Sequence, residues 1–64
     1  MEDLTDRQRT VLEYLVTGWS RKNLADELHV NVNTVHTILN SIISRAQTAS
    51  LIEAIYKYTK AGMI

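Results

Sequence analysis

The chain is 64 residues long, carries no formal net charge and contains no cysteine. A chain of this length forms one domain and buries only about 60% of its unfolded surface, which excludes a deep catalytic cleft beside a core. The lack of cysteine excludes a disulfide framework and a thiolate zinc site. No apolar run approaches the roughly 20 residues that span a bilayer, and the acidic start is unlike a secretory signal. We therefore expect residues 1–64 to form a single cytoplasmic domain without membrane contact.

The first predicted helix covers residues 6–17. Thr5 and Gln8 have the spacing of a capping box, in which each side chain bonds the backbone N–H of the other residue. Gly18 follows the helix, and glycine readily adopts the left-handed conformation that ends one. The expected apolar stripe of this helix consists of Val11, Leu12, Leu15 and Val16.

A short second helix over residues 21–28 and a longer third helix over residues 32–46 come next. Ser20 and Asn31, directly before them, are favoured N-cap residues. About three residues separate the two helices, a length typical of a helix-turn-helix, and Ala25 is small enough to permit their close contact. The third helix has the clearest amphipathic pattern, with an expected buried face of Val35, Ile38, Leu39, Ile42, Ile43 and Ala46.

The fourth predicted helix covers residues 51–60, between the cap residue Ser50 and Gly62. It carries two apolar faces. The first consists of Leu51, Ala54, Ile55 and Tyr58, and the second of Ile52, Tyr56 and Met63, with Thr59 between them. A surface helix needs only one such face, so we expect the second to form a homodimer interface. The alternative is that this helix is buried on two sides within a small core.

Helical spacing of apolar residues recurs along the chain, and no segment alternates polar and apolar residues as a half-buried strand does. We therefore predict an all-α fold, a four-helix bundle with a central helix-turn-helix. In such a motif the second helix projects its outward face into the major groove of DNA.

The outward face of the third predicted helix is built from poor helix formers. It consists of Asn33, Thr34, His36, Thr37, Asn40, Ser41, Ser44 and Arg45. Asparagine can bond adenine through two hydrogen bonds, and the threonine methyl group can contact the methyl group of thymine. We expect base contacts from Asn33, Thr34, His36, Thr37 and Asn40. The alternative is an ordinary polar surface.

Three cations are the expected phosphate-binding residues. Arg21 and Lys22 lie in the first turn of the second helix, where the helix dipole disfavours positive charge, so their position favours contact with a DNA backbone. Arg45 lies near the end of the third helix, where a cation also suits the dipole. Against these three cations stand two acids, Asp26 and Glu27, which leaves residues 20–46 with a net charge of +1. Such a small charge predicts weak binding by a monomer and favours a dimer.

The remaining distinctive residues indicate structural roles. Trp19 is expected to cover the edge of the core between the first two helices. His29 and His36 lack a cysteine or carboxylate at metal-ligand spacing. The sequence also contains no nucleophilic triad, glycine-rich phosphate loop or pair of catalytic carboxylates. We therefore predict no metal, no cofactor and no enzymatic activity.

Several motifs occur together in register. They are Leu4-Thr5-x-Arg7-x-Arg9-x-Val11-Leu12, Gly18-x-Ser20-x-Lys22-x-Leu24-Ala25-x-x-Leu28, Thr34-Val35, Ile42, Glu53-Ala54 and Gly62-Met63-Ile64. With these motifs the chain resembles the LuxR/GerE-type helix-turn-helix domain from Leu4 to Ile64. The resemblance implies a third helix that enters the major groove and a fourth that commonly mediates dimerisation. By position, Lys22, Thr34, Val35 and Arg45 keep family-like chemistry, and His36 keeps it in part.

The chain also departs from the family pattern. It has Gln8 for Glu, His36 for Lys, Ile38 for His, Ser41 for Asn, Leu51 for Arg, and Arg45-Ala46-Gln47 for Lys-Leu-Gly. The favoured interpretation is a stand-alone bacterial or phage transcription regulator that binds double-stranded DNA as a homodimer. The alternative is a protein-interaction module or anti-activator that keeps the fold and binds a protein partner such as a larger LuxR-type regulator.

Overall fold

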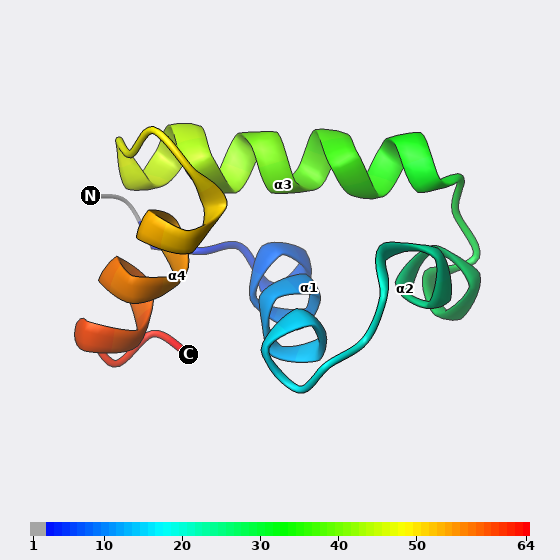
Figure 1. The fold of residues 1–64 in the computed structure, drawn as a ribbon, viewed down its shortest axis with the longest axis horizontal. Helices are drawn as coiled ribbons and strands as arrows, with labels where there is room; N and C mark the ends of the chain where they lie inside the picture. Colours follow the sequence, from blue (N-terminus) through cyan, green and yellow to red (C-terminus); the bar gives the residue numbers. More distant parts are fainter. Residues whose placement is uncertain (1–2) are drawn as a thin grey trace.

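The computed structural model describes residues 3–64, and within them the chain forms four helices and no strand (Figure 1). The helices are α1 (Asp6–Val16), α2 (Arg21–Leu28), α3 (Val32–Ala46) and α4 (Leu51–Lys60). The predicted all-α class is confirmed, and the predicted helices agree with these bounds except that α1 ends one residue earlier. None of the helices in this range is long and apolar enough to cross a membrane.

Side-chain caps start all four helices where the sequence predicts them. Thr5 Oγ1 accepts a hydrogen bond from the Gln8 N–H at 3.1 Å, and Gln8 Oε1 accepts one from the Thr5 N–H at 2.9 Å. Ser20, Asn31 and Ser50 cap the other three helices by accepting a backbone N–H of the first turn. Each cap satisfies a donor that the helix leaves unpaired and stabilises it by about 1 kcal/mol.

Residues in the left-handed conformation follow every helix. Gly18 and Gly62 have φ angles of 103° and 77°, whereas His29 after α2 and Gln47 after α3 adopt 58° and 56° without being glycine. In the turn between α2 and α3, the Val30 N–H donates to the Ala25 carbonyl at 3.0 Å, which closes the end of α2. The turn of the helix-turn-helix therefore depends on a strained histidine.

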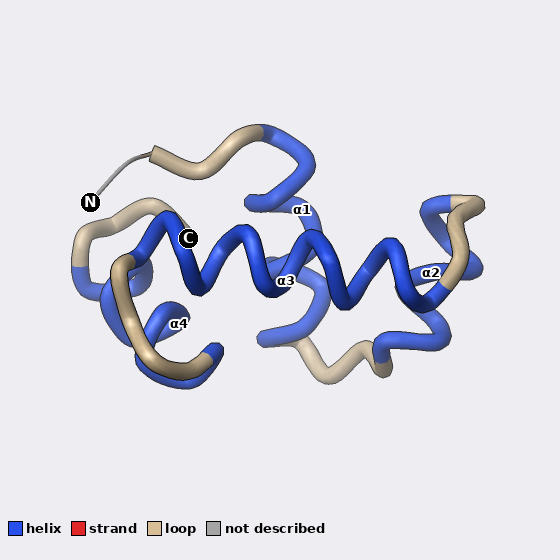
Figure 2. The backbone as a smooth tube through the Cα atoms, turned by 90° about the horizontal axis from the view of Figure 1, so that it is seen from above, coloured by secondary structure: helices blue, strands red, loops and turns tan. Residues whose placement is uncertain are grey.

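The core forms where α3 crosses the other helices. In Figure 1, α3 runs along one side of the molecule and α4, α1 and α2 lie beneath it, and Figure 2 shows α4 and α2 near its opposite ends. The buried apolar side chains are Leu4, Val11, Leu12, Leu24, Ala25, Val35, Leu39, Ile42, Ala46, Ala54 and Tyr58. Because α3 contributes four of these eleven and packs against all three other helices, the core holds α3 in place.

Burial of the predicted apolar faces matches the structure with one exception. On α3, Val35, Leu39, Ile42 and Ala46 are buried, whereas Ile38 and Ile43 are half-buried at the edges of that face. The first face of α4 also packs inward. The prediction for Val16 was wrong, since its side chain is 52% exposed. Val16 is the last residue of α1 and lies one helical turn after the buried Leu12, so its exposure comes from the uncovered end of the helix and not from its helical register.

Candidate nucleic-acid interface

The outward side of α3 carries the predicted base-contacting residues. Asn33, His36, Thr37 and Asn40 are exposed, whereas Thr34 is half-buried. Ser41 and Ser44 are exposed beyond them along the same helix. We refer to Asn33, His36, Thr37 and Asn40 as the reading face. No lysine or arginine belongs to it, so any base contact from this face comes from neutral hydrogen-bonding groups or from the imidazole.

Intramolecular bonds limit what two of the α3 hydroxyl groups can do. Thr37 Oγ1 donates to the Asn33 carbonyl at 3.0 Å, and Ser41 Oγ donates to the Ile38 carbonyl at 2.6 Å. With its proton engaged, the Thr37 hydroxyl can only accept from a base, which suits the amino group of adenine or cytosine. Its methyl group remains available for apolar contact.

A shallow groove places one predicted phosphate-binding residue beside two members of the reading face. The groove has a volume of about 180 Å³ and is lined by Arg21, His36, Leu39, Asn40, Ile43 and Leu51. Arg21 belongs to the first turn of α2, whereas His36 and Asn40 lie one helical turn apart on α3. This arrangement puts a permanent positive charge at the border of a neutral polar face. Sequence spacing did not predict the association, because it depends on how α2 crosses α3.

The other two predicted phosphate-binding residues lie outside this groove. Lys22 is exposed in the first turn of α2 and does not line the groove. Arg45 is half-buried near the far end of α3, where its guanidinium donates to the Asp3 carbonyl at 3.1 Å. Arg45 therefore ties the N-terminal segment to α3 in addition to any contact with DNA.

One hydrogen bond between α1 and α3 was not predicted from the sequence. The buried amide of Gln8 donates from Nε2 to Ser41 Oγ at 3.0 Å. The same amide caps α1 through Oε1, so Gln8 connects the start of α1 to the exposed side of α3. The available signal was that Gln8 and Ser41 both depart from the family pattern.

The second apolar face of α4 is largely uncovered. Ile52 is 80% exposed, Tyr56 is 62% exposed, and Thr59 is also exposed. Met63 differs from them because it is half-buried and packs against the core of its own chain. Lys60 borders the exposed face, with its Nζ atom 3.3 Å from the Tyr56 hydroxyl. The structure thus brings three of the four predicted interface residues onto an exposed surface.

Within residues 3–64, no three histidine or acidic side chains gather closely enough to hold a metal ion. His29 is exposed in the turn, and His36 is exposed on α3. His29 belongs to the left-handed turn after α2, and His36 belongs to the reading face.

Comparisons with known proteins place this fold in a family. Residues 2–58 match the family model described as bacterial regulatory proteins, LuxR family. The chain is 34% identical over 59 residues to the transcriptional regulatory protein DesR of Bacillus subtilis, which covers 92% of this chain and 30% of that protein. It is 37% identical over 51 residues to a Pseudomonas aeruginosa protein named as a candidate transcriptional regulator, covering 80% of this chain and 25% of that protein. The chain thus spans less than a third of either relative, and it belongs to the LuxR family of bacterial regulatory proteins.

Proposed function

We propose that this protein is a sequence-specific DNA-binding transcription regulator in which α3 enters the major groove. The observation that carries the proposal is the exposed reading face of short hydrogen-bonding side chains, bordered by Arg21 and backed by a continuous core. The two relatives named as regulators support it. A regulator of this kind meets DNA in the bacterial cytoplasm, so we propose that location as well.

The geometry suits contact with a B-form duplex. The 15 residues of α3 form a helix about 22 Å long, and the major groove is wide enough to admit one helix. Base contacts are assigned to Asn33, Thr34, His36, Thr37 and Asn40, and phosphate contacts to Arg21, Lys22 and Arg45. The exposed Asn33 and Asn40 favour adenine as a partner. Arg21 and Lys22 lie at the start of α2, whose free backbone N–H groups also attract a phosphate.

We propose further that two copies act together through α4. The interface would consist of Ile52, Tyr56 and Thr59 at its centre and the partly buried Met63 at its edge. Each phosphate contact releases counterions and so adds to affinity. Because one chain has zero net charge and few cations on the DNA side, doubling the contacts in a symmetric dimer increases affinity substantially. We propose that residues 1–64 bind DNA by themselves.

Neutralising the proposed phosphate contacts tests this function. In gel-shift titrations, Arg21→Ala and Lys22→Ala should each weaken duplex binding and reduce the slope of log affinity against log salt by about 2, because each substitution removes one phosphate contact from both copies of the dimer. The matched control is Lys60→Ala, which removes the same charge from α4 and should leave the slope unchanged once an unaltered oligomeric state is verified. A wild-type chain that binds no duplex at low salt would contradict the proposal.

A second candidate function rests on the α4 surface. The 80% exposure of Ile52, together with the zero net charge, favours a protein-interaction module or anti-activator that pairs through α4 with a larger LuxR-type regulator. Under this alternative, Tyr56→Ala abolishes regulation whereas Arg21→Ala and Lys22→Ala leave it intact. Under the DNA-binding proposal, Arg21→Ala and Lys22→Ala each lose regulation.

A further inference from the structure

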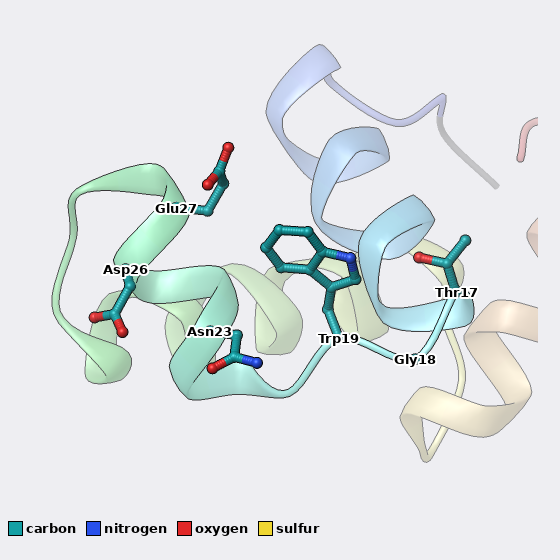
Figure 3. A pocket seen from close by; sticks show the side chains of 6 residues that line it. All are labelled: Thr17, Gly18, Trp19, Asn23, Asp26 and Glu27. Atoms are coloured by element: carbon teal, nitrogen blue, oxygen red, sulfur yellow. The ribbon is translucent and has the colours of Figure 1, made fainter.

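Two surface grooves near α2 differ in the charges that line them. The larger, of about 510 Å³, lies where α1 connects to α2 and is lined by Thr17, Gly18, Trp19, Asn23, Asp26 and Glu27 (Figure 3). We refer to it as the groove at Trp19, whose ring stacks on Tyr14 with 4.6 Å between the ring centroids. In Figure 1 the α1–α2 connection and α3 lie on opposite sides of the molecule, so this acidic groove is separate from the reading face.

The smaller groove, beside the reading face, holds one permanent cation and one titratable side chain. Arg21 lines it from α2 and His36 from α3. Its other lining residues within the described chain carry no charge, and they are Leu39, Asn40 and Ile43 of α3 and Leu51 of α4. The residues one helical turn before and after His36 on α3 are uncharged as well. The guanidinium of Arg21 is therefore the one charged group that shares this groove with the imidazole of His36.

The imidazole of His36 is available to a ligand. Its residue is exposed, and within residues 3–64 no hydrogen bond or ion pair engages the side chains of Arg21, His36 or Asn40. A neutral imidazole offers one N–H donor and one acceptor, whereas an imidazolium offers two donors and a positive charge. A ligand that contacts the imidazolium and Arg21 together must accept hydrogen bonds from both.

Duplex DNA favours the charged form of a histidine at this position. Histidine is the side chain whose charge ordinarily changes between pH 5 and 8. DNA carries one negative charge for about every 1.7 Å of helix axis, and this field stabilises a proton on a nearby imidazole as it stabilises other cations. By linkage, the protonated ring strengthens DNA binding by the same factor by which DNA strengthens protonation.

We propose that His36 takes up a proton when the protein binds a duplex, so that DNA affinity rises as the pH falls from 8 to 6. This inference rests on the proposed function. The imidazolium donates to a group of the duplex that only accepts hydrogen bonds, which is a backbone phosphate shared with Arg21 or the O6 and N7 edge of a guanine. In a dimer two rings take up a proton, which adds two positive charges to an assembly whose formal net charge is zero. His36 thereby makes DNA binding sensitive to pH.

Titrations of a labelled duplex at pH 6, 7 and 8 and constant ionic strength test this inference by fluorescence anisotropy. We expect the wild-type dimer to bind about tenfold more tightly at pH 6 than at pH 8, because the bound state holds more protons than the free state. The slope of log affinity against log salt should be steeper at pH 6 by about 1–2. Circular dichroism at each pH verifies that the chain stays folded.

The chain offers a matched control, because its second histidine lies outside the reading face. His36→Gln keeps a hydrogen-bonding side chain that does not titrate, and it should change affinity less than about twofold between pH 6 and pH 8. His29→Asn removes the histidine of the turn after α2, where asparagine tolerates the left-handed conformation, and should keep the full pH dependence. His36→Lys carries its charge at both pH values, so it should bind with nearly equal affinity at each.

Two duplexes distinguish the acceptor. An equal pH effect on a selected and a scrambled duplex identifies a phosphate, whereas a larger effect on the selected duplex identifies guanine. Equal wild-type affinity at pH 6 and pH 8 overturns this inference and leaves the proposed function standing, as does a pH dependence that survives in His36→Gln or disappears in His29→Asn. A wild-type chain that binds no duplex at either pH overturns the proposed function and this inference together.

Discussion

At the scale of single residues, one hydrogen bond joins two positions at which the sequence departs from the LuxR/GerE pattern. Gln8 stands where the family has Glu, Ser41 stands where it often has Asn, and the two side chains are hydrogen-bonded at 3.0 Å. An amide supplies a donor that an ionised carboxylate lacks, and the Ser41 hydroxyl oxygen accepts it. The two residues are 33 positions apart, so their contact could not be inferred from helical spacing.

Removing this amide should loosen the contact between α1 and α3. Gln8→Ala loses both the bond to the Thr5 N–H and the bond to Ser41, and we expect it to lower the free energy of unfolding by about 1–2 kcal/mol in urea titrations. Gln8→Glu keeps an acceptor for Thr5 and should cost about half as much. Stability of Gln8→Ala within about 0.3 kcal/mol of the wild type would show that the pair contributes little.

Substitutions at His29 and Gly62, which both have a positive φ angle, should change the free energy of unfolding in opposite directions. His29→Gly relieves strain at a φ of 58° and should raise the free energy of unfolding by about 0.5 kcal/mol after the entropy that glycine adds to the unfolded chain. Gly62→Ala introduces the same strain at a φ of 77° while its Cβ atom meets nothing within 4 Å, so it should lower the free energy of unfolding by about 1 kcal/mol. Thermal unfolding measures both. A lower Tm for His29→Gly would contradict this account of the turn.

At the scale of helices, local signals predict most of the fold. The caps at Thr5, Ser20, Asn31 and Ser50 act within three residues of themselves, so the starts of the helices follow from short-range chemistry. The exposure of Val16 was not predictable in the same way, because it depends on whether a neighbouring element covers the last turn of α1. Long-range packing likewise determines the groove that Arg21 shares with α3 and the stacking of Trp19 on Tyr14.

The reading face lacks a cation, and adding one should strengthen DNA binding. His36→Lys places an ammonium group in the groove that Arg21 already lines. We expect tighter duplex binding and a salt slope steeper by about 2 for the dimer, measured by fluorescence anisotropy at pH 8 and several salt concentrations. His36→Gln, which keeps a neutral hydrogen-bonding side chain, is the control and should leave the slope unchanged. An unchanged slope for His36→Lys would remove position 36 from the interface.

At the scale of the whole molecule, the zero net charge is the sum over three surfaces that differ in charge and polarity. The reading face is neutral and bordered by Arg21, the groove at Trp19 is acidic, and the outer face of α4 is apolar. The neutral total therefore does not describe the surface that is proposed to contact DNA. It does limit affinity for a single chain, because only a few phosphate contacts are available. The association of two chains is for this reason part of the proposed function.

The α4 surface can be tested against another exposed aliphatic residue. Ile52→Ser should weaken self-association about tenfold or more in sedimentation equilibrium, since exposed apolar anchors dominate interface energies. Val16→Ser removes a comparable side chain that is 52% exposed on α1 and should have no effect. A wild-type chain that remains monomeric at all concentrations, or equal effects of the two variants, would contradict dimerisation through α4.

The central claim is sequence-specific DNA binding by α3. Its most direct test compares the affinity of the wild-type chain for a duplex selected from a random pool with its affinity for a scrambled duplex, at several salt concentrations. The account predicts a preference of about a thousandfold or more at physiological salt, with enrichment of adenine and thymine at positions that Asn40→Ala makes indifferent. Equal affinity for the two duplexes, or no binding to either at low salt, would contradict it.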